Sequence, residues 1–181
     1  MKELSLNILD VTKNSVSAGA SNILVSLIKD TEGWLTLTIK DDGCGMSKET
    51  VENVTNPFYT TRTTRKVGLG LPLLKLAAEQ TGGRLTITSD QSEEMHGTEV
   101  VAVFDTNSID FMPVGDIVST MCILIAGSPE INFVFWDKAP EGEVGLDTAE
   151  LKAILGDDIS LAEPEVQLWI GEYLKEQYDN R

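Results

Sequence analysis

The stretch Lys40-Asp41-Asp42-Gly43-Cys44-Gly45-Met46 directly follows a run in which apolar and polar residues alternate. This alternation predicts a strand over Trp34–Asp41. Two glycines spaced by one residue let a backbone approach a ligand closely. Asp41, at the end of the strand, can face inward and accept a hydrogen bond from an exocyclic amine such as that of adenine. Alone, the pattern also fits a plain strand-to-helix turn, because Asp-Gly is a common turn pair.

The first helix, predicted over residues 3–18, carries an unusual polar stripe. At 100° per residue, Asn7, Asp10, Asn14 and Ser17 fall on one narrow line, bordered on both sides by Leu, Ile and Val. Because a solvent-facing stripe is normally bordered by charge, we expect this one to be half-buried. Asp10 and Asn14, one turn apart, could hold a hydrated Mg²⁺. The alternative is a helix whose polar edge lies at the opening of a strand.

The segment from Asn56 to Lys66 collects positive charge in an acidic chain. It holds four threonines and three cations after Pro57, and no Asp or Glu. Such clustered donors favour an anion, and Arg62, Arg65 and Lys66 are candidates for binding phosphate. A solvated mobile loop is the alternative.

The segment Val67-Gly68-Leu69-Gly70-Leu71-Pro72 opens a predicted helix over Leu71–Thr81. A glycine loop at a helix start presents free N–H groups and the positive end of the helix dipole to phosphates. The segment is not a P-loop, because no Gly-Lys-Ser/Thr follows. It is also not a dinucleotide fingerprint, because Leu73 occupies the place of the third glycine.

Together, in this order, the four stretches resemble the N box, G1 box, lid-opening segment and G2 box of the histidine-kinase-like ATPases. That superfamily is shared by sensor kinases, gyrase and MutL. Asn14 matches the Mg²⁺-binding asparagine of the N box, and Asp41 matches the aspartate that reads adenine. Pro57-Phe58-Tyr59-Thr60-Thr61-Arg62 is similar to the Pro-Phe-Phe-Thr-Thr-Lys run of sensor kinases, and Gly68-Leu69-Gly70-Leu71 matches the G2 box.

The resemblance covers roughly residues 3–105 and implies the Bergerat fold. This is an α/β (α+β) two-layer sandwich, in which a mixed sheet carries helices on one face and ATP binds under a mobile lid. It implies ATP and Mg²⁺ as cofactors, with Asn14 as the metal ligand. The implied nucleotide-binding residues are Asn14, Asp41, Gly43, Gly45, Thr60, Thr61, Arg62, Lys66, Gly68, Leu69 and Gly70.

Three departures from the family pattern bear on function. Asp10 stands where gyrase and MutL carry a catalytic glutamate, so the resemblance makes Asp10 the candidate base with a reach shorter by one methylene. Lys66 stands where many members have the first glycine of Gly-x-Gly-x-Gly. Ser17 replaces an acidic residue found in MutL-type N boxes.

The remaining sequence predicts further strands and helices and a boundary between two units. Strands are expected at Asn22–Lys29, Arg84–Ser89 and Thr98–Asp105, and a short helix after Ser47. Residues 1–104 carry a net charge of −3, whereas residues 105–181 hold 4 Lys and Arg against 16 Asp and Glu. The shift predicts that residues 106–181 form a separate acidic α/β extension, and the resemblance makes residues 1–105 the ATP-binding domain. In the extension we expect helices at Asp116–Ala126, Asp147–Leu155 and Glu163–Gln177, and a strand at Ile131–Trp136.

Composition excludes several classes of protein. A net charge of −15 and the lack of a large basic patch argue against nucleic-acid binding. No apolar run reaches the ~20 residues that span a bilayer, so no membrane association is expected. Two cysteines make no disulfide scaffold, which favours the cytoplasm.

The function expected is Mg-ATP binding with slow hydrolysis or protein-kinase-like phosphotransfer, regulatory and dependent on a protein partner or phosphoacceptor. The alternative is a non-catalytic module that senses ATP or ADP. The C-terminal segment resembles the tails of small stand-alone bacterial members, and Trp136, Trp169 and Tyr173 could form a partner surface or core. The only histidine, His96, lies between two predicted strands, so self-phosphorylation on histidine within this chain is not expected.

Overall fold

The structure is a computed structural model that describes residues 3–56, 58 and 69–181. Its N-terminal elements are α1 (Leu4–Ser17), β1 (Asn22–Lys29), β2 (Trp34–Asp41), α2 (Lys48–Asn53), α3 (Gly70–Gln80), β3 (Arg84–Asp90) and β4 (Gly97–Asp105). Its C-terminal elements are α4 (Ile117–Gly127), β5 (Asn132–Ala139), β6 (Gly142–Asp147), α5 (Thr148–Leu155) and α6 (Pro164–Asp179). No helix in the described part is both long and apolar enough to cross a membrane.

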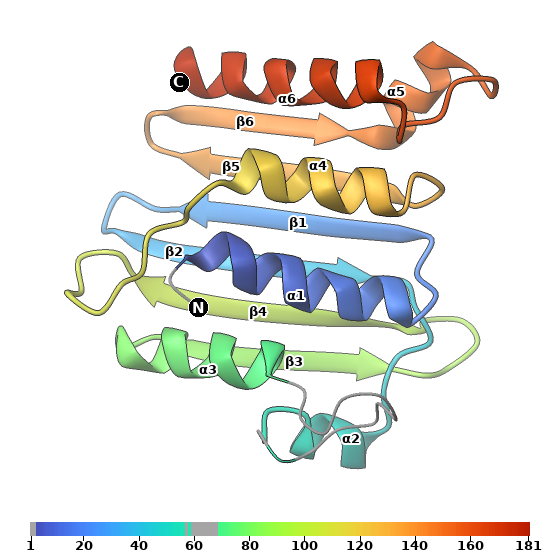
Figure 1. Cartoon of the computed structure of the whole chain (residues 1–181). Helices are drawn as coiled ribbons and strands as arrows, with labels where there is room; N and C mark the ends of the chain where they lie inside the picture. Colours follow the sequence, from blue (N-terminus) through green and yellow to red (C-terminus); the bar gives the residue numbers. More distant parts are fainter. Residues whose placement is uncertain (1–2, 57, 59–68) are drawn as a thin grey trace.

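The strands form one mixed sheet of six strands in the order β3-β4-β2-β1-β5-β6. Neighbours are antiparallel except β1 and β5, which run parallel. Figure 1 shows α1, α3, α4 and α6 side by side on one face of this sheet. The predicted fold class, a mixed sheet with helices on one face, is confirmed.

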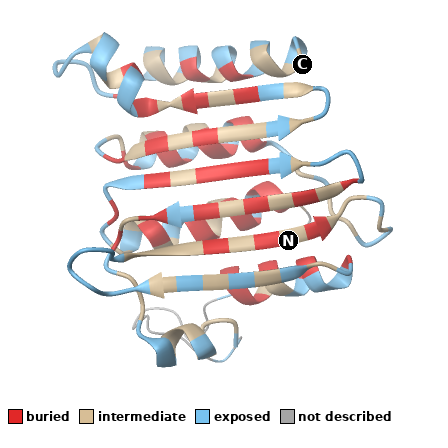
Figure 2. Ribbon diagram, turned by 180° about the vertical axis from the view of Figure 1, so that it is seen from behind, coloured by how far each residue is buried: buried red, intermediate tan, exposed pale blue. Residues whose placement is uncertain are grey.

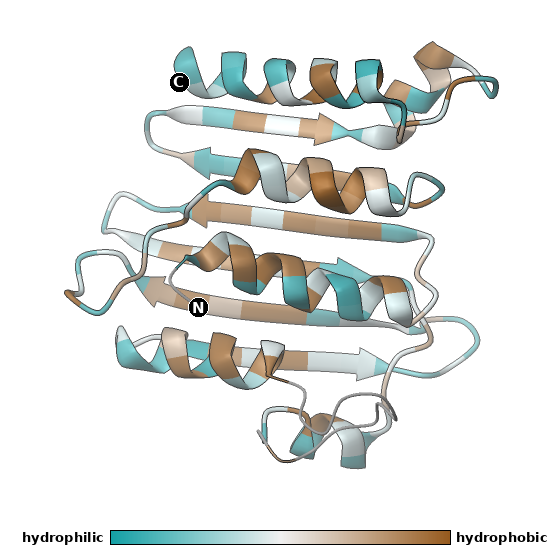
Figure 3. Cartoon of the chain, in the orientation of Figure 1, coloured by the Kyte–Doolittle hydropathy of each residue, from teal (hydrophilic) through white to brown (hydrophobic). Residues whose placement is uncertain are grey.

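The core lies between the sheet and this helical layer. Leu35, Leu37 and Ile39 are buried and alternate along β2 with half-buried residues, which is the period of two expected for a sheet covered on one face. Figure 2 shows the same alternation of buried and more exposed positions along the central strands, and Figure 3 shows the hydrophobic residues concentrated in them and in α4. Burial of this apolar area is the main favourable contribution to folding.

Residues 106–181 do not form a sheet of their own. β5 pairs along its length with β1, from Asn22↔Asn132 to Ile28↔Lys138, and α4 packs against α1. β5 and β6 thus extend the sheet formed by the N-terminal strands, and the division into an ATP-binding domain at 1–105 and an extension at 106–181 stays a prediction.

The strand β6 is absent from the sequence expectations. Its sequence, Gly142-Glu-Val-Gly-Leu-Asp147, contains two glycines and little of the β-branched content that signals a strand. A side chain from α6 protects this edge strand: Gln177 accepts from the Gly145 N–H at 2.9 Å and donates to the Gly145 carbonyl at 3.0 Å. The strand is thus stabilised by tertiary contacts, which leave no local signature.

Candidate functional site

A cavity of about 510 Å³ opens between α1, the start of α3 and the turn after β2. This volume lies in the range usual for small-molecule sites. Predicted site residues that line it are Asp10, Asn14, Asp41, Gly45, Leu69 and Gly70. The structure thus brings together residues from three of the four stretches singled out in the sequence.

Asp41 lies at the floor of the cavity and is only 9% exposed. Its Oδ1 accepts a hydrogen bond from the Gly43 N–H at 2.9 Å, and its Oδ2 accepts one from the Ser15 hydroxyl at 2.5 Å. A carboxylate oxygen can accept two bonds, so each oxygen keeps capacity for a ligand donor. The carboxylate is therefore oriented before any ligand arrives.

The neighbouring aspartate, Asp42, does not line the cavity and instead accepts hydrogen bonds from the start of β1. Its Oδ1 accepts from the backbone N–H groups of Ser21 and Asn22, at 2.7 and 2.9 Å, and its Oδ2 accepts from the Asn22 amide at 2.7 Å. Partial burial opposes the charged form, but these hydrogen bonds together outweigh it and lower the pKa of Asp42. Asp42 thus fastens the turn to the start of β1.

The turn at residues 43–46 is fixed by hydrogen bonds and close packing against neighbouring segments. The Cys44 N–H donates to the Ala18 carbonyl at 3.0 Å, and the Met46 N–H donates to the Ser89 hydroxyl at 2.7 Å. Gly45 has φ of +69°, and a Cβ there would collide with the Asp90 carbonyl. Glycine is required here because both its backbone conformation and the space around it exclude a side chain.

The polar stripe of α1 divides into two parts. Asp10, Asn14 and Ser17 line the cavity, as a half-buried stripe predicts. Asn7 does not: it is 1% exposed, and its amide lies 3.5 Å from the Met112 sulfur. The segment that follows β4 covers this end of the helix, which a reading of α1 alone could not anticipate.

Asp10 faces the N-terminus of α3. A Cβ built on Gly70 would lie 2.6 Å from Asp10 Oδ2, so the missing side chain of Gly70 makes room for this carboxylate. Within the described part of the chain, the N-cap residue Leu69 makes no side-chain capping bond, and the first turn of α3 contains no acidic residue. The positive end of the helix dipole at this position favours an anion.

The other predicted site residues are not among the described residues that line the cavity. Gly43 is behind the cavity, where its N–H supports Asp41. Thr60, Thr61, Arg62, Arg65, Lys66 and Gly68 lie outside the described residues, and their contacts with phosphate remain predictions.

Several lining residues were not singled out from the sequence. They include Ser15, Met46, Ser47, Thr50, Gln91 and Thr98. The strand register places Thr98 opposite Asp41. Ser15 follows Asn14 directly, but its bond to Asp41 joins residues 26 positions apart, which no local pattern reveals.

A magnesium ion at this site would depend on few protein ligands. Within residues 3–56, 58 and 69–181, no group of three or more His, Cys, Asp or Glu side chains could hold a metal. Mg²⁺ commonly keeps several waters and binds one or two protein oxygens together with substrate phosphates. Asn14 and Asp10, which line one wall, fit that mode and do not fit an all-protein cage.

Comparison with known proteins identifies the family. Residues 1–108 match the family described as "Histidine kinase-, DNA gyrase B-, and HSP90-like ATPase". This match spans more than half of the chain, which therefore belongs to this family of ATP-binding domains.

Two curated relatives are longer bacterial kinases. Sporulation kinase E of Bacillus subtilis is 31% identical over 54% of this chain and 13% of its own length. Sensor histidine kinase CpxA of Escherichia coli is 33% identical over 41% of this chain and 17% of its own length. This chain therefore corresponds to a small part of each relative.

Two solved structures share the fold across most of the chain. The N-terminal domain of a DNA repair protein has a TM-score of 0.59 at 16% identity, covering 87% of this chain and 58% of that one. The Aquifex aeolicus MutL ATPase domain complexed with ADP has a TM-score of 0.54 at 15% identity, covering 86% of this chain and 69% of that one. At such identities the similarity concerns the fold alone.

Proposed function

We propose that this chain binds Mg-ATP in the cavity and hydrolyses it slowly or transfers its γ-phosphate to a protein. The observation that carries the proposal is that two different kinds of polar group line the same cavity. A buried, oriented acceptor, Asp41, lies on the floor, while an uncapped helix N-terminus at Gly70 lies on the wall beside Asp10. The first suits the exocyclic amine of adenine, and the second suits phosphates.

Asp10 is proposed as the general base. Its carboxylate lies against Gly70 at the start of α3, which is where the phosphates of the nucleotide would end. A base placed there could orient or deprotonate an attacking water or hydroxyl. Since aspartate reaches less far than glutamate, slow turnover is expected.

The remaining roles concern the phosphates and their counter-ion. Asn14, one turn after Asp10, would hold the Mg²⁺ that bridges phosphate oxygens. Leu69 and Gly70 would offer backbone N–H groups at the helix start. We assign contacts with the β- and γ-phosphates to Thr60, Thr61, Arg62, Lys66 and Gly68 by their match to the family pattern.

We propose further that the activity is regulatory and depends on a partner protein or phosphoacceptor. Residues 105–181 carry a net charge of −12. On α6, Trp169 and Tyr173 stack with ring centroids 4.9 Å apart and remain 47% and 39% exposed. Half-exposed aromatic side chains are enriched at protein interfaces, so this surface supports a partner.

The alternative is a non-catalytic regulatory module that senses ATP or ADP. It is favoured by the aspartate at position 10, because a shorter base in an otherwise complete site could leave binding without chemistry.

The deciding experiment follows the label from γ-labelled ATP. The purified chain is incubated with Mg²⁺ and labelled ATP, alone and with cell extract, beside the Asp10→Asn variant. Label released as phosphate or moved to a protein, and lost in the variant, supports catalysis. Binding without any movement of label in either protein supports the sensor, and the absence of nucleotide binding overturns both.

A further inference from the structure

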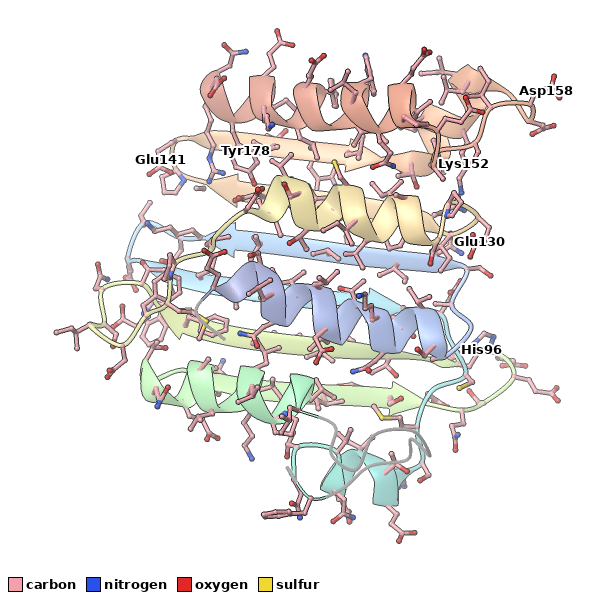
Figure 4. All side chains as sticks on the ribbon, in the orientation of Figure 1. His96, Glu130, Glu141, Lys152, Asp158 and Tyr178 are labelled. Atoms are coloured by element: carbon pink, nitrogen blue, oxygen red, sulfur yellow. The ribbon has the colours of Figure 1, made fainter. Side chains whose placement is uncertain are left out.

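His96, the only histidine, reaches from the β3–β4 connection to the turn after β2. Its Nδ1 lies 2.8 Å from the Gly43 carbonyl oxygen, although the two residues are 53 positions apart. Figure 4 shows His96 at the end of the sheet where α1 ends. A carbonyl oxygen can only accept, so the ring donates through Nδ1–H.

The contact matters because of what else Gly43 does. Its N–H donates to Asp41 Oδ1 at 2.9 Å, so one glycine links the His96 ring to the floor of the cavity. Glycine has no side chain to restrict its backbone dihedral angles. A hydrogen bond on its carbonyl therefore fixes one of the two peptide units that meet at Gly43, next to the unit whose N–H donates to Asp41.

The loop that carries His96 is fixed by close packing and hydrogen bonds of the residues next to it. Gly97 follows it with φ of +141°, and a Cβ there would collide with the Asp41 carbonyl. The Gly97 carbonyl accepts from the Ser89 hydroxyl at 3.0 Å, and the same hydroxyl lies 2.8 Å from that of Thr98. The end of the β3–β4 hairpin is thus packed directly on the backbone of Asp41.

We infer that His96 is a positioning residue for base recognition, which rests on the proposed nucleotide function. His96 is not among the residues that line the cavity. It fixes the Gly43 carbonyl, Gly43 fixes one oxygen of Asp41, and Ser15 fixes the other. The oriented carboxylate then distinguishes a purine that carries an amine at position 6 from one that carries an oxygen there.

The test compares ATP with ITP, which has a carbonyl where adenine has its amine. Dissociation constants for both are measured by calorimetry on the wild type, His96→Ala, His96→Asn and Met95→Ala. Asparagine places an amide N–H at the position of Nδ1, because both nitrogens are bonded to Cγ. Met95, the preceding residue in the loop, is 76% exposed and serves as the matched control.

The wild type should prefer ATP, and His96→Ala should reduce the ratio of the ITP constant to the ATP constant about threefold to tenfold, the effect of one hydrogen bond. His96→Asn should restore the ratio, and Met95→Ala should leave it unchanged. An unchanged ratio in His96→Ala overturns the inference, as does an equal loss in His96→Ala and His96→Asn. A wild type that binds neither nucleotide instead overturns the proposed function.

Discussion

The two ends of the cavity differ in how many internal contacts hold their carboxylates. At the base end, Asp41 receives hydrogen bonds from Ser15 and Gly43, and the surrounding turn is tied to Ala18 and Ser89. At the phosphate end, the Asp10 carboxylate makes no hydrogen bond or ion pair with another described residue. The Asp10 carboxylate therefore keeps its acceptor capacity for a ligand. If Asp41 reads the base as proposed, its acceptor is oriented during folding, which would lower the entropy lost on binding.

The largest effect is expected at the phosphate end. Asp10→Asn keeps the shape and removes the base, so phosphate release or transfer should fall by roughly 10²–10⁴-fold. The dissociation constant of Mg-ATP should stay within about twofold, because little ground-state binding is removed. Turnover and affinity are measured on the same preparation, with Glu32→Gln, an exposed change of equal charge, as the control. Unaltered turnover in Asp10→Asn would remove Asp10 from the chemistry.

The base end should show the opposite behaviour. Asp41→Asn replaces an acceptor with an amide that presents a misplaced donor, so affinity for ATP should fall roughly 10–100-fold, from the ~1.5–3 kcal/mol of a charged hydrogen bond. The rise in melting temperature caused by ATP should shrink accordingly, because it follows mass action. If ATP raises the melting temperature of a folded Asp41→Asn protein as much as that of the wild type, the assignment of the cavity to a nucleotide is wrong.

Asn14→Ala should affect binding and chemistry together, since Asn14 is proposed to hold Mg²⁺. A loss of roughly tenfold in Mg-ATP affinity corresponds to about 1.4 kcal/mol. Titrating Mg²⁺ at constant ATP distinguishes this role, because the variant should lose most of the dependence on Mg²⁺. If the variant responds to Mg²⁺ as the wild type does, the ion is held elsewhere.

The two cysteines offer a test without mutation. Cys44 is exposed and lines the cavity, whereas Cys122 is half-buried and its pKa is raised by burial. Because the thiolate is the reactive form, iodoacetamide should modify Cys44 faster than Cys122. Saturating Mg-ADP should slow the modification of Cys44 several-fold and leave Cys122 unchanged, as measured by mass spectrometry. Equal protection of both thiols would indicate a global change in the protein instead of occupancy of the cavity.

The smallest effect is expected for Asp42, whose substitution should change the stability of the protein without removing a group that lines the cavity. Hydrogen bonds to its charged form lower its pKa below 3.8, so its stabilisation is present above that pH and is lost as pH falls through the folded value. Asp42→Asn should lower the melting temperature by roughly 2–4 °C near neutral pH, as a loss of ~1 kcal/mol would. The difference from wild type should shrink below pH 3.8. A difference that stays constant at acid pH would contradict this role.

Local patterns alone predicted much of the fold and the polar groups of the cavity. The limits of β1 and β2 match the predicted strands, and α1 differs by one residue at each end, because side-chain periods of 2 and 3.6 are properties of a continuous segment. The choice of Asp10, Asn14, Asp41 and Gly70 as neighbours came from the order of four stretches and their family resemblance. Each lies on the cavity that the structure shows.

Only the tertiary structure decided the contacts between distant segments. The pairing of β5 with β1, the edge strand β6 held by Gln177, and the burial of Asn7 under Met112 all join segments about 30 to 110 residues apart. The bonds from Ser15 to Asp41 and from His96 to Gly43 are of the same kind. Such contacts depend on how the elements pack, and packing is selected by the total buried area and by the satisfaction of polar groups. The sequence by itself determined which residues form most of the elements, β6 excepted, and the packing of the elements decided which residues meet.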